Sequence, residues 1–257
     1  MNSHSTPVEF EPKSLVVREV REKLKQWGLS VVMARFNFTG WFTDETRDAF
    51  GAAFISSTEV QEALRKAAVA AGEPKSPLLS ISGRAASVSV ETLSCTQMDL
   101  SMFDKLVEQG LVTGGGLIRK CMEDVFAGVT VSDVVREMMV NEDSENAYVF
   151  EDEEKSELLF HVFRRLSVGG SMNQYDDALK PYLDATRSVY KDLVSVYRSK
   201  RTGEPTIGTQ ALQLTGAEGV TLFPADEHGQ EHSFAYLCID GRNKQVTFWY
   251  NAFVPFW

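Results

Sequence analysis

The chain has 257 residues and a formal net charge of −10, which allows one large domain or two small ones with a sizeable core. Hydrophobic residues make up 43% and charged residues 24%, a balance typical of soluble globular proteins. An acidic surface repels phosphate backbones, so we expect no nucleic-acid partner. No segment approaches the roughly 20 apolar residues of a membrane span, so we expect no membrane partner.

The cysteines and the N-terminus indicate a reducing compartment. Cys95, Cys121 and Cys238 lie far apart without zinc-site spacing, so we expect free and mostly buried thiols. Residues 1–13 are polar, contain two prolines and are expected to be loose. They lack an apolar run behind a basic start, so the sequence predicts no signal peptide and an intracellular protein.

The first two thirds of the chain are predicted to be mainly helical. N-cap residues and apolar residues at helical spacing predict helices at 14–27, 43–54, 56–71, 99–110, 117–126, 131–140 and 153–166. β-branched, aromatic or alternating residues predict strands at 29–38, 78–83 and 87–95.

The last third is predicted to be rich in strands. Strand-like runs cover 189–197, 206–214, 219–223, 233–240 and 244–254. The turn "DGRN", Asp240 to Asn243, joins the last two runs and is a strong hairpin signal. The pattern predicts an α+β fold in which a helix-rich N-terminal part packs on a mainly antiparallel C-terminal sheet. Residues 14–257 would form one domain, with an alternative sub-boundary near 145.

The stretch "GGSMNQYDD", Gly169 to Asp177, has the spacing Gly-Gly, four residues, Tyr-x-Asp. It resembles a motif of iron and 2-oxoglutarate oxygenases in which His-x-Asp holds the metal, but Tyr175 occupies the His position. A neutral phenol binds iron(II) far less well than an imidazole does. We therefore predict that Tyr175 and Asp177 mark a degenerate site that binds no metal. In the simpler interpretation, Gly169 and Gly170 only end a helix by adopting positive φ.

Few other residues offer metal ligands. His4 lies in the loose N-terminus, and His161 lies among apolar residues, where a lone histidine is more often a packing residue. His228 or His232 could supply a distal ligand. The spacing of Arg242 after His232 resembles that of the residue that grips 2-oxoglutarate, but Arg242 falls in the predicted turn and should face water.

No other pattern carries a catalytic site. The chain has no G-x-S-x-G elbow, and the glycines at 114–116 are not followed by a phosphate-binding Gly-Lys-Ser/Thr. Cys121 and Cys238 look like core residues, and the acidic run 141–157 is interpreted as a solvated face. We therefore predict no catalytic residue and no cofactor.

The C-terminal stretch "FWYNAFVPFW" is the most aromatic part of the chain. Most of it should belong to the last strand. Its end, with a proline and free aromatic side chains, is a candidate for docking a partner through Phe253, Phe256 and Trp257.

Several segments in order along the chain resemble the cilia- and flagella-associated protein 300 family. The most specific are "GGSMNQYDD", "PYLDATRSVYKDLVSV" and "HGQEHSFAYLCID". Weaker similarity includes "LKQWG", "AAFISSTEV" and "CTQMDLSMFDKL", while the front of the chain and "NAFVPFW" depart from the animal pattern. Tyr175 belongs to the family pattern itself, which favours a non-metal interpretation of the motif.

The resemblance implies a protein that helps to build outer and inner axonemal dynein arms and that has no known catalytic residues. Its implied locations are the cytoplasm and the ciliary axoneme. The implied partners are dynein-arm assembly factors, axonemal dynein subunits and the intraflagellar transport machinery. We therefore expect a non-enzymatic assembly or adaptor factor. The alternatives are an oxygenase-like enzyme, whose core would be a degenerate jelly roll, and a permanent structural component of the axoneme.

Overall fold

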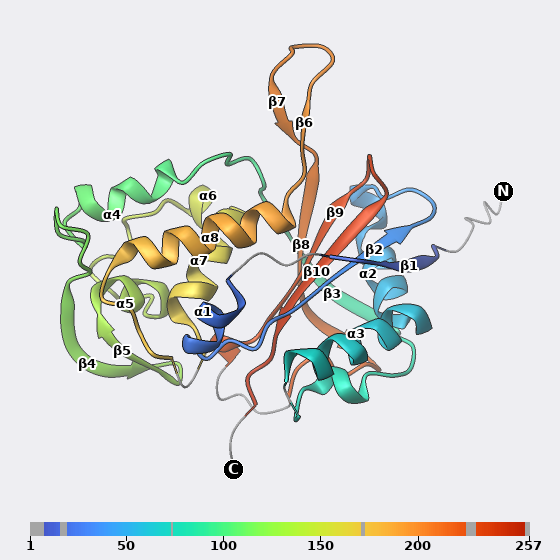
Figure 1. The fold of residues 1–257 in the computed structure, drawn as a ribbon, viewed down its shortest axis with the longest axis horizontal. Coiled ribbons are helices and arrows are strands. Elements are labelled where there is room, and N and C mark those ends of the chain that lie inside the picture. The colour runs from blue at the N-terminus through green and yellow to red at the C-terminus, as the bar shows by residue number, and fades with distance from the viewer. Residues whose placement is uncertain (1–7, 16–19, 73, 171–172, 225–229, 255–257) are drawn as a thin grey trace.

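A six-stranded antiparallel sheet forms the middle layer of the protein, and helices cover both of its faces (Figure 1). The computed structural model describes residues 8–15, 20–72, 74–170, 173–224 and 230–254. The strand order is β1-β2-β10-β9-β8-β3. These strands are β1 (Phe10–Lys13), β2 (Val32–Phe38), β3 (Ser87–Leu93), β8 (Thr209–Glu218), β9 (Phe234–Asp240) and β10 (Gln245–Asn251).

Two separate hairpins extend from this body. One consists of β4 (Lys120–Phe126) and β5 (Val129–Asp133), and the other of β6 (Val196–Arg198) and β7 (Pro205–Ile207). In Figure 1 the β6–β7 hairpin stands up from the end of the sheet, while the β4–β5 hairpin lies against the larger helical layer.

The helices divide unequally between the two faces of the sheet (Figure 1). One face is covered by α2 (Arg47–Ser56) and α3 (Thr58–Ala71). The other face carries α1 (Arg21–Gln26), α4 (Lys105–Glu108), α5 (Val134–Val140), α6 (Asp152–Lys155), α7 (Leu158–Val168) and α8 (Leu179–Leu193). Short 3-10 turns are η1 (Asp44–Thr46), η2 (Pro77–Ser80), η3 (Ser101–Asp104) and η4 (Gln230–His232).

The two central strands are buried on both faces because side chains alternate across a strand. Tyr236 and Trp249 pack into the core of the larger helical layer, whereas Leu237 and Phe248 pack into the core under α2 and α3. The two cores are therefore joined through β9 and β10. No helix of the described ranges is long and apolar enough to cross a membrane.

The α+β prediction is confirmed, but the sheet draws strands from both ends of the chain. The predicted hairpin at "DGRN" exists, with Asp240 opposite Gln245. However, β2 and β3, which match the strands predicted at 29–38 and 87–95, belong to the first two thirds of the chain, and β1 lies within residues 1–13, which were expected to be loose. A jelly-roll core is not found in the parts of the chain that the structure describes, since β1–β3 and β8–β10 form one open sheet with helices on both sides.

Two predicted elements are wrong. Residues 117–126 were expected to be helical because Ile118, Cys121 and Val125 have helical spacing, but the segment forms the first strand of the β4–β5 hairpin. Its turn at Ala127 and Gly128 has positive φ at both residues, which closes a hairpin. Residues 189–193, expected as a strand, end α8.

The remaining differences are smaller. Residues 78–83 form a 3-10 turn and a loop in place of a strand, and 219–223 lie outside the strands. The predicted helix at 14–27 is seen as α1, but its residues 16–19 lie outside the described part. The helix predicted at 153–166 is divided into α6 and α7.

Candidate functional site

The segment Gly169 to Asp177, here called the GG segment, connects α7 to α8 inside the larger helical layer. Gly169 ends α7 with φ 67° and ψ −155°, and its amide donates to the Arg165 carbonyl at 3.0 Å. The predicted role of Gly169 in ending a helix is thus confirmed. Residues 173–177, where the structure describes the chain again, do not form a strand.

Close backbone contact with the end of α1 requires the two glycines. The Gly170 amide donates to the Trp27 carbonyl at 2.7 Å, and the Gln174 amide donates to the Gln26 carbonyl at 2.9 Å. A Cβ atom on Gly170 would overlap the Gly28 carbonyl, and one on Gly169 would lie 2.7 Å from the Trp27 carbonyl oxygen. Glycine therefore allows a helix end and a loop to touch through their backbones.

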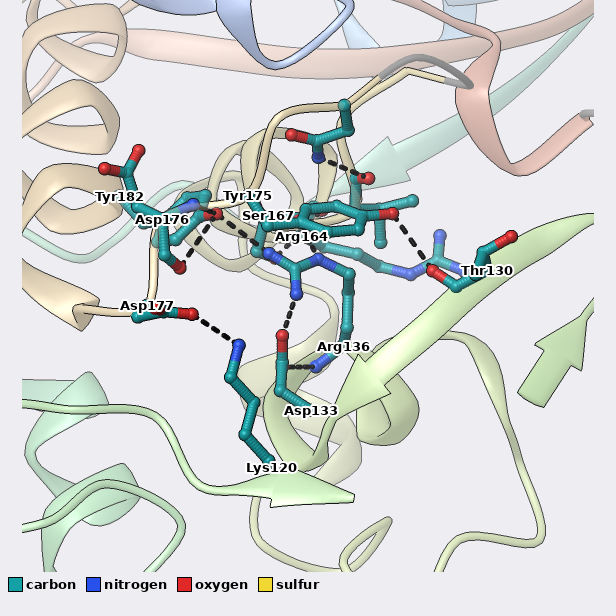
Figure 2. A network of polar contacts seen from close by, with 12 residues as sticks. Lys120, Thr130, Asp133, Arg136, Arg164, Ser167, Tyr175, Asp176, Asp177 and Tyr182 are labelled. Carbon is teal, nitrogen blue, oxygen red and sulfur yellow. Dashed lines mark hydrogen bonds and ion pairs between the residues drawn. The ribbon is translucent and has the colours of Figure 1, made fainter. Parts of the chain in front are cut away.

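A buried arginine lies beside the GG segment (Figure 2). Arg136 of α5 is 1% exposed and pairs with Asp133, whose carboxylate also accepts from the Arg136 amide at 2.9 Å. Its guanidinium donates from Nε to the Ser167 carbonyl at 2.8 Å and from Nη2 to the Tyr182 hydroxyl at 2.8 Å. Burial lowers the pKa of Arg136. A carboxylate and hydrogen-bond acceptors for its N–H groups are the partners that stabilise a buried guanidinium.

Tyr175 covers the same guanidinium. The Arg136 Cζ atom lies 3.4 Å from the centre of the Tyr175 ring, and the Tyr175 hydroxyl donates to the Thr130 carbonyl of β5 at 3.0 Å. Burial raises the pKa of this phenol, so it stays protonated. In Figure 2, Tyr175 lies between α5 and the β4–β5 hairpin.

The two aspartates of the GG segment contact different elements, α1 and β4. Asp176 accepts from the Trp27 indole at 2.8 Å and pairs with Lys23 of α1 at 2.7 Å. Asp177 pairs with Lys120 of β4, which lowers the pKa of the exposed Asp177 carboxyl. The Asp177 carbonyl also accepts from the Ile118 amide at 2.8 Å. The GG segment and Arg136 therefore form one junction, called the Arg136 junction, that ties α1, α8 and the β4–β5 hairpin to the core.

The histidines weighed as metal ligands have other partners. His161 Nδ1 lies 3.2 Å from the Tyr236 hydroxyl, and His232 Nδ1 lies 2.7 Å from the Gly169 carbonyl, to which it donates. Burial, reinforced by nearby arginines, lowers the pKa of His161 to about 3, and burial also lowers that of His232. His4 and His228 lie outside the described residues, and within the described ranges no group of three or more metal-ligating side chains is present.

The other residues considered as possible functional groups differ in how far they are exposed. Arg242 is exposed in the β9–β10 turn, as predicted. Cys238 is buried, while Cys121 is half-buried on β4 and not on a helix. Cys95 is half-buried, and burial raises the pKa of its thiol to about 11. The acidic run 141–157 is not a uniformly solvated face, because Glu157 is 5% exposed and accepts from the Thr96 amide at 3.0 Å.

The C-terminal aromatics are mainly core residues. Trp249 and Tyr250 are at most 1% exposed in β10. Phe253 is half-buried, with its ring 5.7 Å from that of His232. Phe256 and Trp257 lie outside the described residues, so docking through these aromatic side chains stays a prediction.

Sequence reasoning missed an apolar surface around the β4–β5 hairpin. Leu117 is 54% exposed, Met122 88% and Val125 61%. We call these three residues the β4–β5 surface. They were missed because residues 117–126 were predicted to form an amphipathic helix. The spacing of Asp133 and Arg136, three residues apart, is a sequence signal that could have indicated the buried ion pair next to this hairpin.

Comparison with known proteins supports the resemblance. The model of the cilia- and flagella-associated protein 300 family matches residues 6–251. A protein of that name from Chlamydomonas reinhardtii is 34% identical over 170 residues, covering 64% of this chain and 64% of the relative's length. Another from Paramecium tetraurelia is 30% identical over 203 residues, covering 78% of this chain and 76% of the relative. No solved structure matches.

The family match extends across the sheet, both hairpins and the Arg136 junction. The GG segment, which carried the most specific resemblance, is the centre of that junction. The chain therefore belongs to the cilia- and flagella-associated protein 300 family.

Proposed function

We propose that the protein is a non-enzymatic assembly or adaptor factor for the outer and inner dynein arms of motile cilia. Membership of a cilia- and flagella-associated family supports a ciliary role. In this proposal the protein works in the cytoplasm and in the cilium, alongside assembly factors, dynein subunits and intraflagellar transport.

The β4–β5 surface is the observation that carries the proposal. Met122 and Val125 lie on β4, and Leu117 lies three residues before it. Large exposed apolar residues close together in the chain are typical of protein interaction sites, and Met122 is 88% exposed. The Arg136 junction holds this hairpin through Tyr175 and Asp177. A surface that is fixed before binding loses less conformational entropy when a partner docks.

The contacts of the GG segment favour an adaptor over the oxygenase alternative. Tyr175 and Asp177 each bind the β4–β5 hairpin, and His232 donates to the Gly169 carbonyl. These are internal structural contacts. If the purified protein bound iron(II) and 2-oxoglutarate, and Asp177→Ala abolished that binding, the non-enzymatic proposal would be wrong.

The adaptor proposal is tested by affinity capture from cytoplasm before cilia grow. The wild-type protein should recover dynein heavy chains or dynein-arm assembly factors. A Met122→Glu/Val125→Glu variant should lose them. Val69→Glu is a matched control, because Val69 is also apolar and 70% exposed but lies on α3.

Recovery of neither class of protein by the wild-type chain would contradict the adaptor proposal. Equal recovery by the double variant would show that the β4–β5 surface is not the docking site. The structural-component alternative predicts that detergent-extracted axonemes retain the protein after salt removes the dynein arms. An assembly factor should be absent from such axonemes.

A further inference from the structure

The β6–β7 hairpin projects from the end of the sheet and has an ordered tip (Figure 1). The Ser199 amide donates to the Glu204 carbonyl at 2.8 Å, and the Gly203 amide donates to the Ser199 carbonyl at 2.9 Å. Arg198 donates from Nη1 to the Gly203 carbonyl at 2.7 Å. The backbone of the tip is therefore folded, and the Arg198 side chain is bound to it.

Positive charge gathers around this hairpin and the neighbouring β9–β10 turn. The basic end of the sheet, as we call it, comprises Arg198, Lys200, Arg201, Arg242 and Lys244. Among the described residues, none of these five forms an ion pair with a carboxylate. Acidic side chains lie at the same end, namely Glu204 in the tip, Asp240 in the β9–β10 turn and Asp44, which accepts from Gln210 at 3.2 Å. The hairpin tip, residues 198–204, thus carries three cations and one carboxylate, the opposite balance to a chain whose net charge is −10.

Aromatic side chains accompany two of the cations. The Arg242 guanidinium lies 4.6 Å from the centre of the Tyr197 ring, and Lys244 Nζ lies 3.7 Å from that of the Trp41 ring. Trp41 is 81% exposed. Tryptophan, tyrosine and arginine, which Trp41, Tyr197 and Arg242 supply here, are the residue types enriched at energetically important protein contacts.

We propose that the basic end binds an acidic polypeptide segment of a partner protein. Unpaired cations attract carboxylates, and Trp41 supplies apolar contact that charge alone does not give. A short acidic segment can reach the projecting hairpin while avoiding the acidic remainder of the chain. Long polyanions such as duplex DNA, and extended anionic membranes, would meet that repulsive remainder.

This surface is separate from the β4–β5 surface, and the inference does not depend on the dynein-arm proposal. Figure 1 places the two hairpins on different parts of the molecule. The β4–β5 surface is apolar and is connected to the buried Arg136 junction. The basic end is positively charged and includes the projecting β6–β7 hairpin. A protein with both could hold two partners at once.

The test measures binding of the full chain to a fluorescent oligo-glutamate peptide by anisotropy at low salt. The wild-type protein should bind, and added salt should weaken binding because exposed charges are screened. Lys200→Glu/Arg201→Glu should weaken affinity about tenfold. Lys66→Glu/Lys180→Glu is the matched control, since it changes the net charge equally at exposed positions on α3 and α8.

The control variant should bind nearly as well as wild type, and Trp41→Ala should weaken binding about fivefold. Melting temperatures of the variants should differ by only a few degrees, since the substituted side chains are exposed and the Lys180–Asp184 pair that the control loses is a surface pair. Equal weakening by the two charge variants, or no binding by wild type, would overturn the proposal. So would equally tight binding to duplex DNA or to phosphatidylserine vesicles, because these would assign the basic end to a different ligand class.

Discussion

The β4–β5 and β6–β7 hairpins are stabilised by different kinds of contact. An isolated two-stranded ribbon is only marginally stable in water. The β4–β5 hairpin gains support from side chains of the core, through the Tyr175 and Asp177 contacts of the Arg136 junction. The β6–β7 hairpin relies on hydrogen bonds within its own tip and on one stack between Tyr197 and Arg242. Removing the contacts that anchor the β4–β5 hairpin should therefore destabilise the whole fold. Removing the contacts of the β6–β7 hairpin should leave the protein folded.

The largest expected effect comes from removing the buried cation. Arg136→Met leaves the Asp133 carboxylate buried without its partner and should lower the free energy of unfolding by about 3–5 kcal/mol. Urea denaturation followed by circular dichroism measures this loss. Arg187→Met is a matched control, since Arg187 is exposed and 3.9 Å from Asp184, and should cost less than about 1 kcal/mol. A loss below about 1 kcal/mol for Arg136→Met would mean that the hairpin is not anchored as described.

Close backbone packing gives the next effect. Gly170→Ala forces a methyl group against the Gly28 carbonyl and should cost about 1–3 kcal/mol. Gly241→Ala, in the β9–β10 turn, meets no atom within 4 Å and should change the free energy of unfolding by less than about 0.5 kcal/mol. Similar losses in the free energy of unfolding for the two variants would mean that the backbone contact at Gly170 is no more important for stability than the open β9–β10 turn.

A fall in pH should lower the free energy of unfolding through His161 of α7. Its pKa is lowered to about 3 from the usual 6.5. Below about pH 6.5 the unfolded chain binds a proton that the folded chain does not bind. The free energy of unfolding should therefore fall as pH decreases toward 3, by up to about 1.4 kcal/mol per pH unit from this residue. His161→Gln should show a shallower slope in urea titrations between these pH values, and an unchanged slope would exclude His161 as the source.

The smallest effect is expected at the projecting hairpin. Arg242→Ala removes the stack on Tyr197 and should cost about 0.5 kcal/mol, because the pair is exposed. Hydrogen exchange should speed up within β6 and β7 and remain unchanged in β9. Faster exchange throughout the sheet would show that the hairpin supports the fold after all.

The sequence predicted elements well where local chemistry agreed with the tertiary fold. The β9–β10 hairpin was predicted because an Asp-Gly turn lies between two apolar runs, and Asp240 does accept from the turn amides of Arg242 and Asn243. The end of α3 was predicted from Gly72, which adopts φ 85°. Its N-cap is Ser57 and not the expected Ser56, an error of one residue.

Prediction failed where burial depends on distant partners. Tyr182 and Val189 are buried on α8, although the β-branched residues near its end favoured a strand. For the candidate site, the position of Gly169 at a helix end was predictable from one residue type. The contacts of Tyr175 with Arg136 and Thr130 were not, because residues from three separate segments must first fold together.

The order of strands in the sheet has a consequence for synthesis of the protein. β2 pairs with β10, so that Val32 lies opposite Tyr250. The central strands β9 and β10 are thus synthesised long after β2, whose second edge stays unpaired until β10 is made. Such long-range pairing slows folding and leaves apolar strands open to aggregation. The nascent chain should therefore depend on chaperones until β9 and β10 emerge and complete the sheet.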